Sequence, residues 1–150
     1  MSLMLDELYQ EVLMDHFRRP RCAGCINNPS SAASLFNPLC GDQVHLSLRI
    51  VNDTIEDMAF SGHGCSISQA SASMMGELCK GKSVEEVRKI QSLFRGMMRG
   101  EKCEQECESL GDAAVLSGVR KFSARVKCAA LAWEALDKCI DEAIARAKPA

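Results

Sequence analysis

The chain has 150 residues, of which 47% are hydrophobic and 25% are charged, and its formal net charge is −2. This balance is typical of a globular chain with one hydrophobic core and argues against disorder. The small net charge gives no electrostatic reason to expect nucleic acid or an anionic membrane as a partner. No apolar run approaches the roughly 20 residues that span a bilayer, and acidic residues interrupt the N-terminal segment where a signal peptide would be apolar. We therefore expect a cytoplasmic protein with a single domain over 1–150.

In the first third of the chain, apolar residues at helical spacing predict a helix over 4–18, which Pro20 ends. A loop rich in turn-forming residues follows. Three strands are then predicted from alternating or β-type residues, over 32–36, 43–51 and 54–61. The tight turn at Asn52-Asp53 predicts that the last two of these strands form an antiparallel hairpin.

In the second half of the chain, helical periodicity dominates. Helices are predicted from Ser66 to Gly81, from a capping box at Ser83 to Met97, and over 127–147. The charged segment 101–109 is predicted to be a loop, and a short helix capped by Asp112 follows it. The fold class is therefore α+β, with a small three-stranded antiparallel sheet packed against helices.

The chain contains nine cysteines, which is unusual for its length. The odd number and the absence of a signal sequence argue against a disulfide framework. Thiols in the cytoplasm stay reduced, so metal binding, sulfur chemistry and core packing are the remaining interpretations.

Three cysteines lie at the edges of predicted elements. Cys40 lies in a turn before a strand, Cys65 opens a helix after a glycine-rich turn, and Cys128 begins the last helix. Asp42 is close enough to Cys40 to bind the same ion. Three thiolates and one carboxylate form a suitable tetrahedral zinc set, and the thiolates also suit iron–sulfur chemistry. On spacing alone, three buried cysteines and a turn-forming aspartate remain an equal alternative, because the wide separations match no compact zinc-finger pattern.

These cysteines lie in three blocks that resemble the signature motifs of the IscU/NifU N-terminal iron–sulfur cluster assembly family. The blocks read Asn37-Pro38-Leu39-Cys40-Gly41-Asp42-Gln43, Gly62-His63-Gly64-Cys65-Ser66-Ile67-Ser68-Gln69 and Arg125-Val126-Lys127-Cys128-Ala129-Ala130-Leu131-Ala132-Trp133. Within the family the chain resembles the SufU-like branch. Scaffold-type members carry a His where this chain has Lys127, and they carry a Leu-Pro-Pro-Val-Lys run where it has 121–125. The segment 82–111 resembles the extra segment typical of SufU proteins.

The resemblance implies a zinc site formed by Cys40, Asp42, Cys65 and Cys128, with Cys40 as the catalytic sulfur acceptor. It implies that a pyridoxal-phosphate-dependent cysteine desulfurase of the SufS, IscS or NifS type is the sulfur donor, so that the chain acts as a sulfurtransferase. Downstream iron–sulfur assembly proteins would be the recipients. One alternative is a scaffold that builds a [2Fe–2S] cluster on the same cysteines, with iron or a transient cluster in place of zinc. Another is a non-catalytic, zinc-stabilised interaction domain.

Four further cysteines form two pairs in predicted loops: Cys22 with Cys25, and Cys103 with Cys107. Surface thiols are the favoured interpretation, and a second four-cysteine metal site is the alternative. A dithiol oxidoreductase using Cys22 and Cys25 is the weakest hypothesis, because the pair lacks the strand-then-helix setting of thioredoxin-like motifs.

For several other side chains we expect a structural role rather than a chemical one. His63 is expected to be a turn residue rather than a metal ligand. His16 and His45 are expected to be surface or partly buried residues without chemistry. The serines at 66, 68, 71 and 73 are expected to have no nearby base and to permit close helix packing, and the methionine pairs at 74–75 and 97–98 are expected to pack in the core.

Overall fold

A computed structural model describes residues 3–39, 41–102 and 104–147. Within these ranges the elements follow one another as α1 (Leu3–Arg18), β1 (Ser31–Asn37), β2 (Asp42–Val51), β3 (Thr54–His63), α2 (Ser66–Cys79), α3 (Val84–Met98), α4 (Glu104–Cys107), the 3₁₀ segment η1 (Glu108–Lys121) and α5 (Ser123–Ala147). The predicted α+β class with a three-stranded antiparallel sheet is confirmed. In the described residues, no helix is both long and apolar enough to cross a membrane.

The sheet has the strand order β1-β2-β3, and both pairs of neighbours are antiparallel. Asn52 and Asp53 have positive φ angles of 50° and 60°, which is the backbone that a two-residue hairpin turn requires. The alternation in β2 places Val44, Leu46 and Leu48 in the core. At the other end of β2, Asp42 lies opposite Asn37, the last residue of β1.

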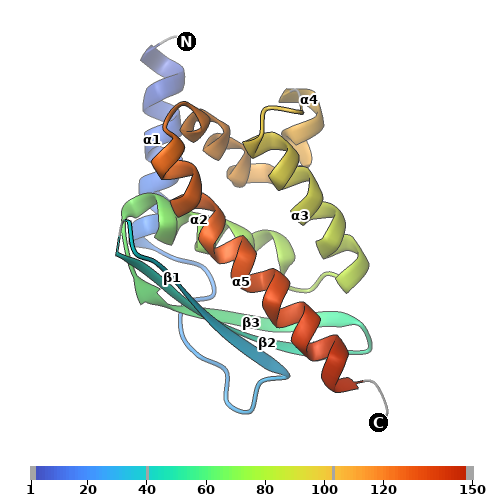
Figure 1. Cartoon of the computed structure of the whole chain (residues 1–150). Coiled ribbons are helices and arrows are strands. Elements are labelled where there is room, and N and C mark those ends of the chain that lie inside the picture. Colours follow the sequence, from blue (N-terminus) through green and yellow to red (C-terminus); the bar gives the residue numbers. More distant parts are fainter. Residues whose placement is uncertain (1–2, 40, 103, 148–150) are drawn as a thin grey trace.

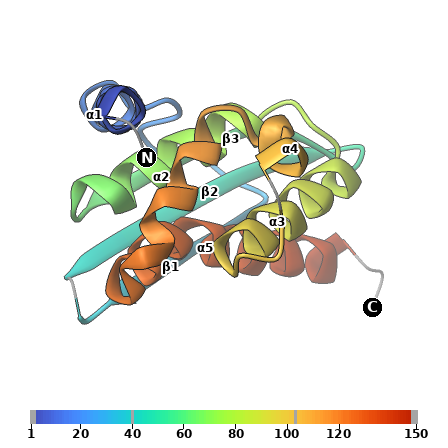
Figure 2. The same cartoon turned by 90° about the horizontal axis from the view of Figure 1, so that it is seen from above.

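The helices lie over the sheet, with α5 crossing β1 and β2 (Figure 1). Seen from above, α2 lies between α1 and α5 (Figure 2) and packs against both. Trp133 of α5 stacks on Phe94 of α3, with the ring centroids 4.2 Å apart and the planes 10° from parallel. The two methionine pairs are buried, as predicted: Met74, Met75, Met97 and Met98.

The segment between α3 and α5 differs from the prediction. The expected loop over 101–109 contains the short helix α4 and the start of η1. The buried residues of η1 are spaced three apart: Leu110, Ala113, Leu116 and Val119. A 3₁₀ helix has three residues per turn, so this spacing places Ala113, Leu116 and Val119 on one face of the part that follows Gly111. A kink at Gly111, where φ is 56°, divides the segment just before Asp112.

Candidate metal centre

Three elements that are far apart in sequence bring two thiols and one carboxylate together. Asp42 is the first residue of β2, Cys65 caps the N-terminus of α2, and Cys128 lies in the second turn of α5. One ligand atom from each lies within 4.8 Å of the other two. Three of the four predicted metal ligands therefore converge. The fourth, Cys40, lies outside the described residues.

Asp42 is fully buried and firmly held. Its Oδ1 accepts a hydrogen bond of 2.8 Å from the backbone N–H of Cys65, and its Oδ2 lies 3.9 Å from the Cys65 Sγ. A Cβ on residue 64 would lie 2.5 Å from the Asp42 Oδ1, so Gly64 permits this close approach. The glycine before Cys65 therefore leaves the space that the Asp42 carboxylate occupies.

Cys65 uses its sulfur as a helix cap. The Sγ accepts from the backbone N–H of Ser68 at 3.5 Å, and the Cys65 backbone is extended, as at an N-cap. The sulfur thereby gives an acceptor to one of the amides that the first turn of a helix leaves unpaired.

Cys128 is fully buried, and its Sγ lies 3.7 Å from the carbonyl oxygen of Ala124, one turn earlier. Helix α5 begins at Ser123, four residues before the predicted start, so Cys128 lies inside the helix rather than at its first turn. The buried sulfur points toward the end of the sheet where Asp42 lies.

Arg125 adds a positive charge to this centre. The charge of Cys65 raises the pKa of the Arg125 guanidinium, and a hydrogen bond to Cys128 raises it further. In the sequence only Lys127 was noted beside Cys128, as the residue that replaces a His, and Arg125 was missed. Helical spacing was the available signal, because residues three apart lie on the same face of a helix. Lys127 is exposed.

The donor set fits zinc. Two ligands of one tetrahedral zinc ion lie about 3.3–3.8 Å apart for bond lengths of about 2.0–2.3 Å. The three described ligand atoms lie within 4.8 Å of one another, so shifts of about an ångström would let them share one ion. Thiolates with a carboxylate are ligands that zinc accepts, and thiolates also hold iron–sulfur clusters.

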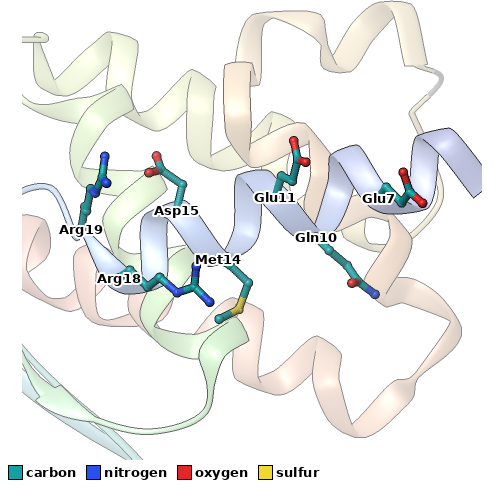
Figure 3. A pocket seen from close by; sticks show the side chains of 7 residues that line it. All are labelled: Glu7, Gln10, Glu11, Met14, Asp15, Arg18 and Arg19. Atoms are coloured by element: carbon teal, nitrogen blue, oxygen red, sulfur yellow. The ribbon is translucent and has the colours of Figure 1, made fainter.

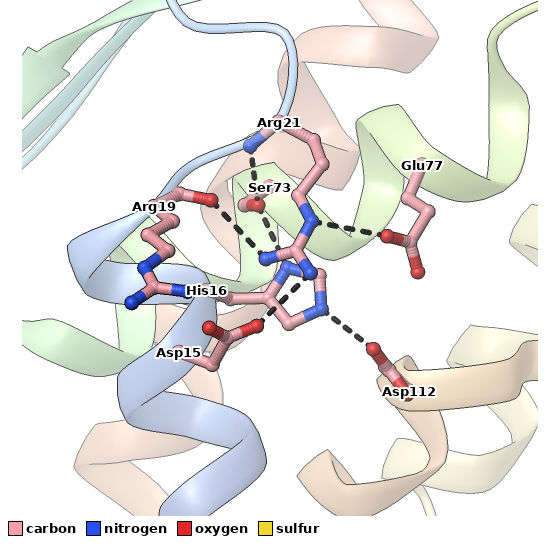
Figure 4. A network of polar contacts seen from close by, with 7 residues as sticks. All are labelled: Asp15, His16, Arg19, Arg21, Ser73, Glu77 and Asp112. Atoms are coloured by element: carbon pink, nitrogen blue, oxygen red, sulfur yellow. Dashed lines mark hydrogen bonds and ion pairs between the residues drawn. The ribbon is translucent and has the colours of Figure 1, made fainter.

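His63 ends β3 and is exposed, and it does not belong to the group formed by Asp42, Cys65 and Cys128. A second group with metal-ligating atoms within 4.8 Å of one another consists of His16, Glu77 and Asp112. These side chains already have polar partners (Figure 4). The Arg21 Nε lies 3.1 Å from the Glu77 Oε2, and the His16 Nε2 lies 2.8 Å from the Asp112 Oδ2.

Two expectations are wrong: that His16 is at the surface or partly buried, and that Ser73 has no base nearby. His16 is fully buried, and its Nδ1 lies 2.7 Å from the Ser73 Oγ. The backbone N–H of Arg21 donates to the same Oγ at 2.8 Å. The His16 Nε2 lies 2.8 Å from the Asp112 Oδ2, so both ring nitrogens have a polar partner. The histidine ties α1 to α2 and η1, a contact that sequence spacing alone does not reveal.

The additional cysteines have different environments. Cys25 is exposed, as expected, and Cys22 is half-buried with its pKa raised by burial. Cys107 is buried in the core cluster, so the surface interpretation is wrong for it. Cys103 lies outside the described residues. Among the residues with a described placement, the groups that could hold an ion contain neither Cys22, Cys25 nor Cys107, so the structure gives no support to a second cysteine site.

A hollow of about 520 Å³ along the outer face of α1 contains none of the residues of the metal centre. Its lining, shown in Figure 3, is mostly charged: Glu7, Gln10, Glu11, Met14, Asp15, Arg18 and Arg19. It includes no thiol and no imidazole, so it offers neither a thiol nucleophile nor the thiolate and imidazole ligands that structural zinc sites use.

Residues 8–129 match the sequence model of the NifU-like N-terminal domain. The chain is 46% identical over 134 residues to the zinc-dependent sulfurtransferase SufU of Bacillus subtilis, covering 89% of this chain and 90% of that one. It is 43% identical over 136 residues to the iron–sulfur cluster assembly scaffold protein IscU of Streptococcus pyogenes, covering 91% and 84%. A crystal structure from Fervidobacterium islandicum, described as a candidate assembly scaffold for the SUF system, superposes with a TM-score of 0.82 at 33% identity, covering 93% and 99%.

Proposed function

The chain belongs to the family of NifU-like N-terminal domains, and on this basis we propose that it is a zinc-dependent sulfur carrier for iron–sulfur cluster assembly. The convergence of Asp42, Cys65 and Cys128 is the observation that carries this proposal. The similarity to a relative named as a zinc-dependent sulfurtransferase supports zinc as the metal and sulfur transfer as the activity.

We assign Asp42, Cys65 and Cys128 as zinc ligands and Cys40 as the fourth. Bound zinc would keep its cysteine ligands deprotonated at neutral pH and lower their nucleophilicity. The protein contributes a preformed arrangement: the Cys65 N–H fixes the Asp42 carboxylate, and the N–H of Ser68 at the start of α2 donates to the Cys65 sulfur.

Cys40 is the proposed sulfur acceptor. As a thiolate it attacks the terminal sulfur of a persulfide on the donor protein, so that a new S–S bond forms on Cys40 and the donor's S–S bond breaks. The bonding electrons leave with the donor's cysteine as a thiolate, so the exchange needs no external oxidant or reductant. Leu39 and Gly41, on either side of Cys40, are both exposed, which supports access by a partner. Arg125 places a positive charge beside the anionic sulfur atoms of the centre.

The proposed donor is a pyridoxal-phosphate-dependent cysteine desulfurase, with the cofactor on that partner, and the recipients are downstream iron–sulfur assembly proteins. Three large apolar side chains are exposed next to the segments that form the centre: Phe36 by 60%, Leu39 by 71% and Phe122 by 61%. Exposed aromatic and aliphatic side chains of this size suit a protein–protein contact.

A cluster scaffold is the second candidate. Thiolates on a partly enclosed site suit a [2Fe–2S] cluster, and the relative from Streptococcus pyogenes is named as a scaffold. In this reading iron and sulfide are assembled on the same residues, and the cluster is the cargo of the protein.

One paired experiment separates the two candidates. The zinc-loaded protein is mixed with a cysteine desulfurase and cysteine, and both enzyme turnover and persulfide on the chain are measured. The same protein is then incubated anaerobically with iron and sulfide, and its visible absorption is recorded. We expect strong stimulation of turnover, one persulfide per chain and little cluster. A stable cluster with unchanged turnover would replace the carrier with the scaffold.

A further inference from the structure

One buried amide in the described structure has an unsatisfied donor. Asn37 is 7% exposed, and its Oδ1 accepts the backbone N–H of Leu39 at 3.2 Å. Its Nδ2 is buried and has no hydrogen-bond partner among the described residues. The Oδ1 contact fixes which way the amide points, because a flipped amide would place its NH₂ against the Leu39 N–H. Unsatisfied buried donors are rare and call for an explanation.

The strand register places Asn37 beside the candidate metal centre. Asn37 lies directly opposite Asp42 in the β1–β2 pair, and directly opposed residues project from the same face of a sheet. Six residues earlier on that face, the Ser31 Oγ donates to the carbonyl oxygen of Cys139 in α5 at 2.6 Å.

The lengths of β1 and of α5 lead to the same placement of Asn37. From Ser31 to Asn37 the strand advances roughly 20 Å, and from Cys139 back to Cys128 the helix covers roughly 17 Å. The amide of Asn37 therefore lies at the Cys128 end of α5, where Asp42 also lies. The Asp42 Oδ1 already accepts from the Cys65 N–H, and no contact joins the Asn37 Nδ2 to either oxygen of this carboxylate.

We propose that Asn37 is a positioning residue whose Nδ2–H donates a hydrogen bond to the anionic sulfur that this centre receives. This inference rests on the proposed sulfur-carrier function and deepens it. Among the described residues this donor has no acceptor, and a persulfide sulfur at the centre would supply one. An interaction made only in the loaded form stabilises that form selectively, so it prolongs retention of the sulfur.

The chain allows a matched set of variants. Asn37→Asp keeps the shape and the oxygen that accepts from Leu39, and it replaces only the NH₂ donor. Asn37→Leu is neutral and also lacks the donor, so it separates loss of donation from charge repulsion. Asn52→Asp makes the same chemical change in the exposed hairpin turn, away from Asp42, and serves as the control.

The experiment loads each zinc-containing protein with sulfur from cysteine and a desulfurase, removes enzyme and cysteine, and follows the remaining persulfide in a fixed concentration of a small thiol. Zinc content and circular dichroism are recorded for each variant. We expect Asn37→Asp and Asn37→Leu to retain zinc and to lose sulfur roughly tenfold to a hundredfold faster than the wild type, while Asn52→Asp behaves as the wild type.

Three results would overturn the inference while leaving the carrier function intact. Both Asn37 variants could hold sulfur as long as Asn52→Asp does, or only Asn37→Asp could lose it faster, which indicates charge repulsion. The variants could also lose zinc affinity with unchanged sulfur retention, which assigns the amide to the metal-bound thiolates. A wild-type protein that accepts no sulfur would remove the carrier function and this inference together. If Asn37→Leu does not fold, Asn37→Ala, which is also neutral and lacks the donor, takes its place in the comparison.

Discussion

Asp42 is expected to have two separable roles, and two substitutions distinguish them. Its Oδ1 accepts the Cys65 N–H at 2.8 Å, and its side chain is fully buried. Asp42→Ala removes this charge-assisted hydrogen bond and leaves a buried N–H without its partner, at a cost of about 1.5–3 kcal/mol. For a chain of this size each kcal/mol shifts the melting temperature by about 2–4 °C, so a fall of roughly 3–12 °C is expected.

Asp42→Asn keeps an oxygen for the Cys65 N–H but removes the negative charge. In the metal-free protein its melting temperature should therefore stay much closer to that of the wild type. Both variants lose the carboxylate ligand, so both should bind zinc more weakly by at least the roughly 10–100-fold that the loss of an outer-shell partner costs.

The assay is thermal unfolding of the metal-free, reduced proteins, followed by zinc competition with a chromophoric chelator. Equal melting temperatures for Asp42→Asn and Asp42→Ala would contradict the hydrogen-bonding role. Unchanged zinc affinity in both variants would contradict the role as a ligand. The wild-type protein measured in the same buffer is the reference for both comparisons.

Three further outcomes are expected. Burial raises the pKa of the Cys79 thiol to about 12, so at pH 8 Cys79 stays a thiol. It should resist alkylation in the native protein while exposed Cys25 reacts, and rapid labelling of Cys79 at pH 8 would contradict its burial. Cys40→Ala should fold but carry no persulfide, whereas Cys25→Ala should carry it normally; persulfide on Cys40→Ala would exclude Cys40 as the acceptor. Ser71→Ala removes the hydroxyl that accepts from the Trp133 Nε1 at 3.1 Å, so urea unfolding should show a loss of about 1–3 kcal/mol, and no loss would mean that the indole finds another partner.

Local signals in the sequence predicted most of the fold. The alternation in β2, the turn at Asn52-Asp53 and the capping residue Ser83 all act within a few residues, and the structure confirms each of them. The Ser83 Oγ accepts from the backbone N–H of Glu86 at 3.1 Å, as a capping box requires.

The segment between α3 and α5 could not be predicted in this way. Its buried residues follow a period of three, which matches neither an α-helix nor a strand, and Gly111 interrupts the pattern. The burial of His16 also depends on partners 57 and 96 positions away in the chain, Ser73 and Asp112. Contacts of this range come from the packing of α1 against α2 and η1.

The candidate centre could be predicted only by recognising motifs. Asp42, Cys65 and Cys128 lie on three elements, and their spacing matches no compact metal motif, yet the fold brings them within 4.8 Å of one another. Two features near the centre were not predicted. Arg125 was missed although it lies three residues before Cys128 in the same helix. The unsatisfied amide of Asn37 depends on the hydrogen bonds of a folded turn.

X-ray absorption spectroscopy of the zinc-loaded protein tests the central claim most directly, because it reports the atoms bound to the ion. The proposed ligand set predicts three sulfur atoms at about 2.3 Å and one oxygen at about 2.0–2.2 Å. Cys128→Ser should lower the number of sulfur neighbours by one. A first shell made only of nitrogen and oxygen, or one that is unchanged in Cys128→Ser, would contradict the assignment of this centre.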